Sequence, residues 1–122
     1  MADVIEERAG TPVLVCDPGG PPIATEQDAL DLIGATYLGA DVVAVPASRL
    51  DRRFFSLGTR FAGEVMQKFA NYRVRLVVVG DISALVAASP ALAALVRESN
   101  TAGHVWFVPD LDALDDRLRH AA

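Results

Sequence analysis

Apolar residues along this chain follow two kinds of spacing, one typical of β-strands and the other typical of helices. Residues 74–79 form an apolar run broken only by Arg75, which predicts a strand covered on both faces in the middle of a parallel sheet. In residues 59–72 the apolar positions instead recur at helical spacing, with a polar stripe on the opposite side. The chain therefore combines buried strands with amphipathic helices.

Turn and capping residues divide the rest of the chain into further elements. Ala9-Gly10 separates two short β-type runs and predicts a hairpin, and Thr25 with Asp28 predicts a capping box at a helix start. The remaining predicted elements are a strand over 41–45, a helix opened by Ser89-Pro90, a strand over 104–108 and a final helix capped by Asp110. The order β-β-α-β-α-β-α-β-α predicts one α/β domain with a mixed, mostly parallel sheet.

Composition narrows the classes of function. The 122 residues are 52% hydrophobic, which fits a single domain with one core. A net charge of −5 argues against nucleic acid or an acidic membrane as a partner. Cys16 is the only cysteine, so an internal disulfide is excluded and a buried thiol in a reducing compartment is expected. The N-terminus has no apolar core and the apolar runs fall short of the ~20 residues that span a bilayer, so we predict a cytoplasmic protein.

Polar groups gather in residues 54–81, around the position where open α/β sheets bind ligands. Ser56 and Thr59 precede the predicted helix, and they either cap it or hold a phosphate or small anion at its start. Asp81 follows Gly80 at a strand end, and it either caps the next turn or acts as a metal ligand or base. Histidine and cysteine spacing predicts no metal site, cofactor or catalytic triad.

Two further groups of side chains are candidates for contact with a partner. Arg52 and Arg53 precede Phe54 and Phe55, and arginine and aromatic residues are enriched at the centres of protein interfaces. The alternative is that both rings pack beneath the following helix. The polar stripe of that helix is either a binding face or a solvated one, and it consists of Glu64, Gln67, Lys68 and Asn71. Its Glu64 and Lys68 have the spacing of a helical ion pair, worth about 0.3 kcal/mol. At the helix end, Tyr72 is expected to pack.

One block of residues in the central part of the chain carries a further signal. It consists of Phe54-Phe55, Leu57, Thr59, Ala62-Gly63-Glu64, Gln67-Lys68-Phe69, Asn71-Tyr72-Arg73, Leu76 and Val79-Gly80-Asp81, with residues 27–34 and 98–100 outside this block. In these residues the chain resembles a bacterial domain-of-unknown-function family, number 4180 in that series. The resemblance covers about residues 27–100 and implies no established activity.

The architecture also resembles the STAS domain, the fold of anti-sigma-factor antagonists that is found at the ends of sulfate transporters as well. In the antagonists, a serine or threonine in an Asp-Ser-Gly-like turn is phosphorylated to break a partner complex. The comparable turn here is Ser56-Leu57-Gly58-Thr59, which lacks the preceding aspartate. Phosphorylation of Ser56 or Thr59 is thus an expectation that rests on the resemblance alone.

Two hypotheses of different classes follow. The leading one is a non-enzymatic protein-interaction or regulatory module that binds another protein, or itself as a homodimer, through residues 52–59 and the polar helix face. The alternative is a small-anion-binding protein or small enzyme that uses the Ser56–Thr59 turn with Asp81 and Lys68. The alternative requires a concave pocket where these polar groups converge. The module requires a flat or convex patch with buried aromatic residues.

Overall fold

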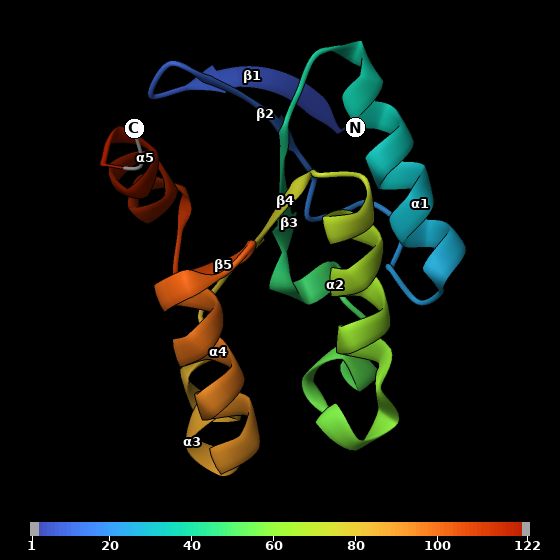
Figure 1. The fold of residues 1–122 in the computed structure, drawn as a ribbon, viewed down its shortest axis with the longest axis vertical. Helices are drawn as coiled ribbons and strands as arrows, with labels where there is room; N and C mark the ends of the chain where they lie inside the picture. The colour runs from blue at the N-terminus through green and yellow to red at the C-terminus, as the bar shows by residue number, and fades with distance from the viewer. Residues whose placement is uncertain (1–2, 121–122) are drawn as a thin grey trace.

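The computed structural model describes residues 3–120 (Figure 1). The strands are β1 (Val4–Arg8), β2 (Thr11–Val15), β3 (Val42–Pro46), β4 (Arg75–Val79) and β5 (Val105–Val108). The α-helices are α1 (Glu26–Ala35), α2 (Phe61–Asn71), α3 (Ser83–Ala88), α4 (Pro90–Ala102) and α5 (Leu111–Arg119). Four short 3-10 turns complete the order: η1 (Thr36–Leu38), η2 (Ala47–Arg49), η3 (Arg52–Phe55) and η4 (Leu57–Thr59).

The five strands form one sheet in the order β1-β2-β3-β4-β5. Strand β1 is antiparallel to β2, and the other neighbours run parallel, so the predicted mixed and mostly parallel sheet is confirmed. Strand β4 lies between β3 and β5, with Leu76 opposite Val43 on one side and opposite Val105 on the other. This central position explains the apolar run that predicted the strand.

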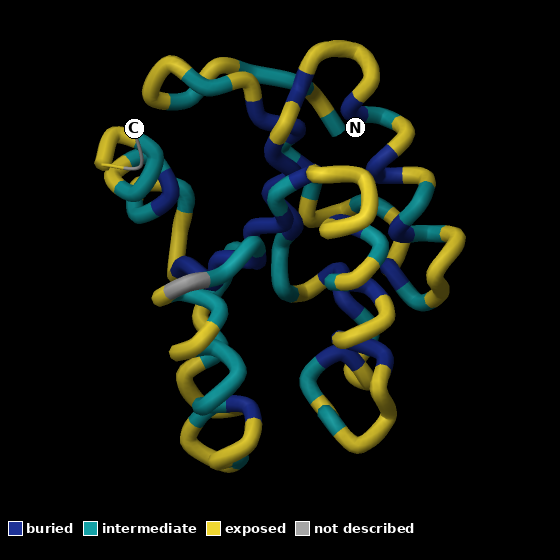
Figure 2. Tube along the Cα trace, viewed as in Figure 1, coloured by how far each residue is buried: buried dark blue, intermediate teal, exposed yellow. Residues whose placement is uncertain are grey.

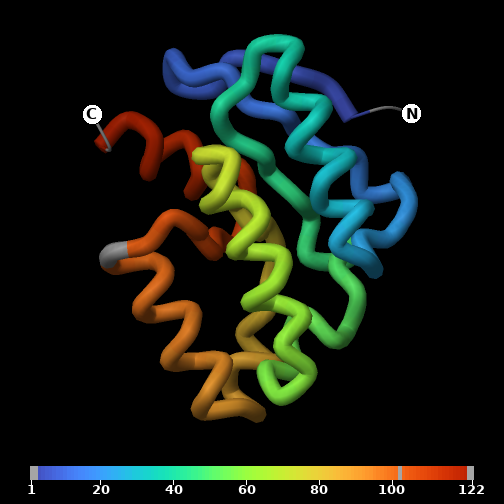
Figure 3. Tube along the Cα trace, turned by 45° about the vertical axis from the view of Figure 1, so that its right-hand side comes forward, coloured from blue at the N-terminus to red at the C-terminus, as the bar shows by residue number. Residues whose placement is uncertain are grey.

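Alternate strand residues contribute to two separate cores, because successive side chains point to opposite faces of a sheet. Val43 and Val45 face the larger core, which lies beneath α1 and α2 and includes Phe69. Val42 and Ala44 face the smaller core, which lies beneath α5. Figure 3 shows α5 on the side of the sheet away from α1 and α2, and Figure 2 shows the buried residues concentrated along the strands.

Arginine side chains cover part of the smaller core. The ring of Trp106 lies under the guanidinium groups of both Arg75 and Arg117, at 4.0 and 4.4 Å from the ring centroid. Burial and the neighbouring Arg117 lower the pKa of Arg75. The guanidinium of Arg8 in β1 pairs with Asp115 in α5 at 2.7 Å. Helix α5 therefore contacts both edge strands of the sheet, β5 through Arg117 and β1 through Asp115.

Several local predictions are confirmed. Ala9 and Gly10 have φ values of 49° and 82°, which closes the hairpin between β1 and β2. Thr25 Oγ1 accepts a hydrogen bond from the Asp28 amide at 3.1 Å, and the Asp28 carboxylate accepts one from the Thr25 amide at 3.1 Å. Ser89 and Asp110 cap α4 and α5 as expected. Cys16 is buried, and burial raises the pKa of its thiol to about 12.

Two expectations about helices and side chains are wrong. The connection between β4 and β5 contains two helices rather than one, because α3 precedes α4. Helix α3 has six residues and none of them is buried, so it has no apolar stripe that periodicity could reveal. Tyr72 does not pack against the core, since 52% of its surface is exposed.

The irregular segment after β3 is fixed by a buried arginine. Arg49 is 3% exposed, and its Nη1 lies 2.8 Å from the Asp3 carboxylate. The same side chain donates to the backbone carbonyls of Asp17 and Pro21. A buried guanidinium with this many acceptors holds the loop after β2 against the loop after β3. The carboxyl end of the sheet is therefore well ordered where β2 and β3 finish.

Candidate functional site

Six of the ten predicted site residues line three separate depressions, whereas Arg53, Phe54, Thr59 and Asn71 line none of the three. Arg52, Phe55 and Ser56 line a cavity of about 350 Å³, which we call the loop cleft. Glu64 and Lys68 line a depression of about 320 Å³ between α1 and α2, which we call the helix groove. Asp81 lines a third depression, of about 200 Å³, with the residues that end β4 and β5. The three share no lining residue, so the convergence of Ser56, Asp81 and Lys68 that the alternative hypothesis requires is not found.

The loop cleft lies at the carboxyl end of β3. Its lining residues are Ala47, Ser48, Leu50, Arg52, Phe55, Ser56 and Leu85. Ala47 directly follows β3, and a Cβ added to Gly80 would lie 3.1 Å from the Ala47 Cβ. Gly80 also has a φ of 149°, so glycine is required where β4 ends beside the cleft. The cleft thus occupies the edge of a parallel sheet where ligands are commonly bound.

The two arginines of η3 have different environments. Arg53 pairs with Asp51 at 2.9 Å, donates to the Ala24 carbonyl and lies 4.7 Å from the centre of the Phe61 ring. Arg52 lines the loop cleft and is exposed, and it forms no ion pair with any other residue between 3 and 120. Arg53 is therefore held by the fold, whereas the guanidinium of Arg52 is available to a ligand.

The two phenylalanines of η3 also differ in their environments. Phe54 is fully buried and contacts Phe107 across the core at 6.5 Å between ring centroids. Phe55 is half-buried, packs edge-on against Phe54 at 5.3 Å and forms a wall of the loop cleft. The expectation that both rings pack beneath the helix is thus confirmed for Phe54, while Phe55 also faces the cleft.

Neither hydroxyl of the Ser56–Thr59 turn occupies the N-cap position of α2, contrary to the capping expectation. The chain makes the turn η4 first, and Arg60 becomes the N-cap in a left-handed conformation with a φ of 66°. Thr59 Oγ1 still accepts a bond from the Phe61 amide at 3.3 Å and lies 2.8 Å from the carbonyl oxygens of Arg53 and Ser56. The Ser56 hydroxyl makes no capping bond and is exposed. Phosphorylation at either residue stays a prediction.

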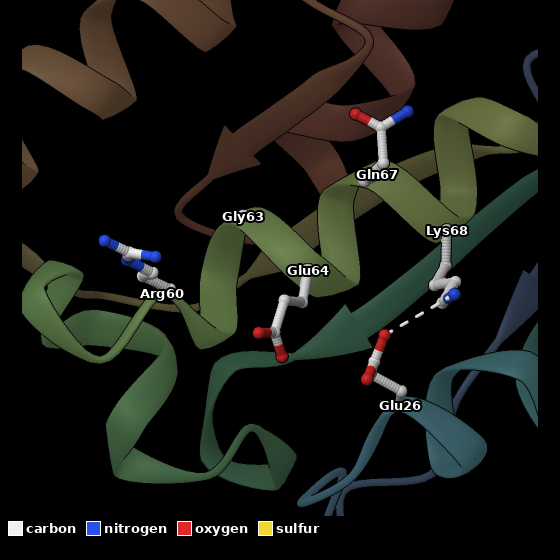
Figure 4. Close-up of a pocket in the computed structure, with 6 residues that line it drawn as sticks. All are labelled: Glu26, Arg60, Gly63, Glu64, Gln67 and Lys68. Carbon is white, nitrogen blue, oxygen red and sulfur yellow. Dashed lines mark ion pairs between the residues drawn. The ribbon is translucent and has the colours of Figure 1, made fainter.

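Figure 4 shows the helix groove, in which Glu64 and Lys68 of α2 face Glu26 in the first turn of α1. Lys68 Nζ lies 3.5 Å from the carboxylate of Glu26 in α1, so the partner of Lys68 is Glu26 rather than the predicted Glu64. Spacing within one helix gave no sign of this pair, because α1 and α2 come together only through the fold. Gln67 points to the other side of α2 (Figure 4) and donates to Asn71 at 2.8 Å.

Gly63 forms part of the helix groove. It is the third residue of α2 and is exposed, and a Cβ added there would meet no other atom of residues 3–120 within 4 Å beyond its chain neighbours and the backbone of its own helix. The packing of the chain therefore does not require glycine at this position. Arg60, at the same groove, has a backbone conformation that is costly for a side chain other than glycine.

Asp81 acts as a turn cap. Its carboxylate accepts a hydrogen bond from the Ser83 amide at 2.9 Å, and its hydrogen bonds from Ser83 lower the pKa of the carboxyl group. An exposed carboxylate with a lowered pKa is a poor base near neutral pH. Among residues 3–120, no group of three histidine, cysteine or acidic side chains is placed to hold a metal ion.

Sequence reasoning did not single out several residues that line the loop cleft and the helix groove. In the loop cleft they are Ala47, Ser48, Leu50 and Leu85, and in the helix groove they are Glu26, Arg60 and Gly63. Leu85 is 45% exposed in α3, and an exposed leucine is a signal only after the helix has been located. Glu26 of α1 comes beside Lys68 of α2 only through the fold.

The fold and these surface sites define a small, single α/β domain with depressions formed by its helices and loops. The chain belongs to the family described as "Domain of unknown function (DUF4180)", which matches residues 8–118. Searches of curated proteins and of solved structures found no match. The resemblance to the STAS domain therefore stays a prediction about architecture. Within residues 3–120, no helix combines the length and apolar character needed to cross a bilayer.

Proposed function

We propose that the protein is a non-enzymatic protein-interaction module of the regulatory kind, that it works in the cytoplasm, and that it holds another protein in the helix groove. The free thiol of Cys16 fits a reducing compartment. The observation that carries the proposal is the open space above Gly63.

A glycine inside a helix destabilises it by about 0.5–1 kcal/mol relative to alanine. At Gly63 no packing contact within residues 3–120 offsets this cost, because an added Cβ would meet no atom within 4 Å apart from its chain neighbours and the backbone of its own helix. A close approach by another protein explains the glycine, since only the missing side chain lets a second backbone reach α2. The strained Arg60 lines the same groove, and backbone strain is concentrated at functional sites.

The charges of the helix groove favour a polar contact with a defined register. Lys68 and Glu26 are paired with one another and hold α1 against α2. Arg60 and Glu64 are exposed and of opposite sign, so they suit a partner surface that carries both charges. Such pairs give specificity rather than large affinity, as a reversible regulatory contact requires.

A pair of matched glycine substitutions tests the proposal. Gly63 and Gly34 are both exposed, both lie within helices, and both have open space where a Cβ would stand. We expect Gly63→Ala and Gly34→Ala each to raise the free energy of unfolding by about 0.5–1 kcal/mol. Only Gly63→Ala should weaken the binding of the partner, because only Gly63 lines the groove.

The partner is detected with a photo-crosslinking amino acid placed at Glu64, which faces the groove (Figure 4), in cells that make the protein, with Leu38 as the control position. We expect one crosslinked protein from position 64 and not from position 38, with a yield that falls in Gly63→Ala and is unchanged in Gly34→Ala. A product of twice the chain mass identifies the partner as a second copy of this chain. Equal yields from the two glycine variants would contradict the proposal.

A further inference from the structure

We propose that the loop cleft binds a small organic anion, namely a carboxylate attached to an apolar body. This inference goes beyond the interaction through the helix groove and does not depend on it, because the two sites share no lining residue. It follows from the donors of the cleft, its apolar walls and its place in the fold.

The polar groups of the cleft are all able to donate to an anion. They are the guanidinium of Arg52 and the hydroxyls of Ser48 and Ser56. Arg52 forms no ion pair with the other described residues, although the chain carries a net charge of −5. A planar guanidinium binds a carboxylate through two parallel hydrogen bonds, and hydroxyls beside it satisfy the remaining lone pairs.

The other walls select an apolar body. Leu50, Phe55 and Leu85 line the cleft together with Ala47. Leu85 is 45% exposed, and α3, which carries it, has no buried residue. A ligand lying between Phe55 and Leu85 would remove apolar surface from water on both sides, which favours an apolar ligand over an inorganic anion. The cavity of about 350 Å³ lies at the lower end of the range for small-ligand pockets, about 300–1,000 Å³.

The cleft is formed before any ligand arrives. Phe54 is fully buried next to Phe55, and the buried Arg49 holds the turn that precedes Leu50. Gly80 brings the end of β4 against Ala47. Binding to a preformed site costs little ordering of the chain, so a small ligand can bind measurably.

Amide chemical shifts of the purified 122-residue chain test the inference, with phenylacetate, benzoate, hexanoate and indole-3-acetate as probes. We expect at least one of them to give saturable shifts at Ser48, Ser56 and Leu85 at concentrations up to about 10 mM, where a dissociation constant near 1 mM is readily measured. The matching neutral amide of that probe should bind roughly tenfold more weakly or worse, because it cannot form the charged pair with Arg52.

Two matched pairs of variants complete the test. Arg52→Gln should weaken the binding of the acid by roughly tenfold, whereas Arg97→Gln, at an exposed position on α4, should leave that binding unchanged. Leu85→Gln should also weaken the binding of the acid. Leu38→Gln, at a leucine that is 85% exposed, should leave that binding unchanged. The inference is overturned if none of the four acids binds, if the acid and its amide bind equally well, or if the Arg52→Gln variant binds the acid as tightly as the unsubstituted chain does.

Gly63→Ala should leave the binding of the acid unchanged. This variant therefore distinguishes ligand binding in the loop cleft from partner binding in the helix groove.

Discussion

Asn100 is the residue whose removal gives the sharpest test of the fold, because its side chain completes the outer edge of the sheet. Strand β5 has β4 on one side only. On its open side the amide of Phe107 donates to Asn100 Oδ1 at 2.8 Å, and Asn100 Nδ2 donates to the carbonyl of Phe107 at 3.1 Å. The side-chain amide thus takes the place of a neighbouring strand at this position. The perturbation is Asn100→Ala.

The magnitude follows from the two groups that lose their partners. Phe107 is buried, so little water reaches its N–H and C=O after the side chain of Asn100 is removed. Each hydrogen bond contributes about 1 kcal/mol, and a buried group left unsatisfied costs about 1–3 kcal/mol. Asn100 is itself half-buried, so water reaches part of the vacated space and lowers the total. We expect Asn100→Ala to lower the free energy of unfolding by about 2–4 kcal/mol.

Urea unfolding followed by the fluorescence of Trp106 measures this loss, since Trp106 is the only tryptophan and precedes Phe107 in β5. Hydrogen exchange at the Phe107 amide should quicken more than at neighbouring strand amides. The control is Asn71→Ala. Among residues 3–120, the exposed side chain of Asn71 forms a hydrogen bond only with Gln67, so its removal should change the free energy of unfolding by no more than about 0.5 kcal/mol. A loss below about 1 kcal/mol for Asn100→Ala, or unchanged exchange at Phe107, would refute the reasoning.

Two further predictions concern ionisable groups. The Asp28 carboxylate accepts hydrogen bonds from the backbone of Ala24 and Thr25, and the bond from Ala24 is the main cause of its lowered pKa. Its contribution should be complete above the ordinary pKa of about 4 and be lost as the pH falls through the lower pKa of the folded state. Asp28→Ala should therefore be less stable by about 1 kcal/mol at pH 7, and the gap should narrow in thermal melts as the pH falls below about 4. A gap of constant size would show that the carboxylate charge has no part in the cap. Burial raises the pKa of the Cys16 thiol to about 12, so a thiol reagent at pH 8 should react far more slowly with the folded chain than with the chain in urea. Equal rates would mean that the thiol is accessible in the folded protein.

Local signals account for most of the fold that the sequence could predict. The start of α1 depends on Thr25 and Asp28, which are three residues apart and interact with each other, so no distant contact is needed to recognise it. The same holds for the hairpin turn at Ala9 and Gly10. Strand β4 was evident because burial on both faces leaves an apolar run in the sequence.

The segment before α2 could not be predicted because its conformation depends on distant contacts. Arg60 begins α2 in a left-handed conformation, although serine and threonine stand just before it and are the usual caps. Arg49 fixes the same region through Asp3, which is far away in the sequence. Helix α3 was missed for a related reason, since its few residues bury nothing and carry no period.

The candidate site was predicted as one surface, and the structure divides it because of how parallel α/β domains are built. Each unit of strand and helix leaves the carboxyl edge of the sheet, continues along a helix on the sheet face, and returns at the opposite edge. Residues 52–81 follow this path, so Arg52 and Ser56 lie at the edge while Glu64 and Lys68 lie on the helix face. Nearness in sequence within such a block does not imply a shared pocket. Substitutions at Arg52 and Gly63 should therefore act independently. The double variant should bind the organic acid as weakly as the single Arg52 variant does, and it should bind the partner protein as weakly as the single Gly63 variant does.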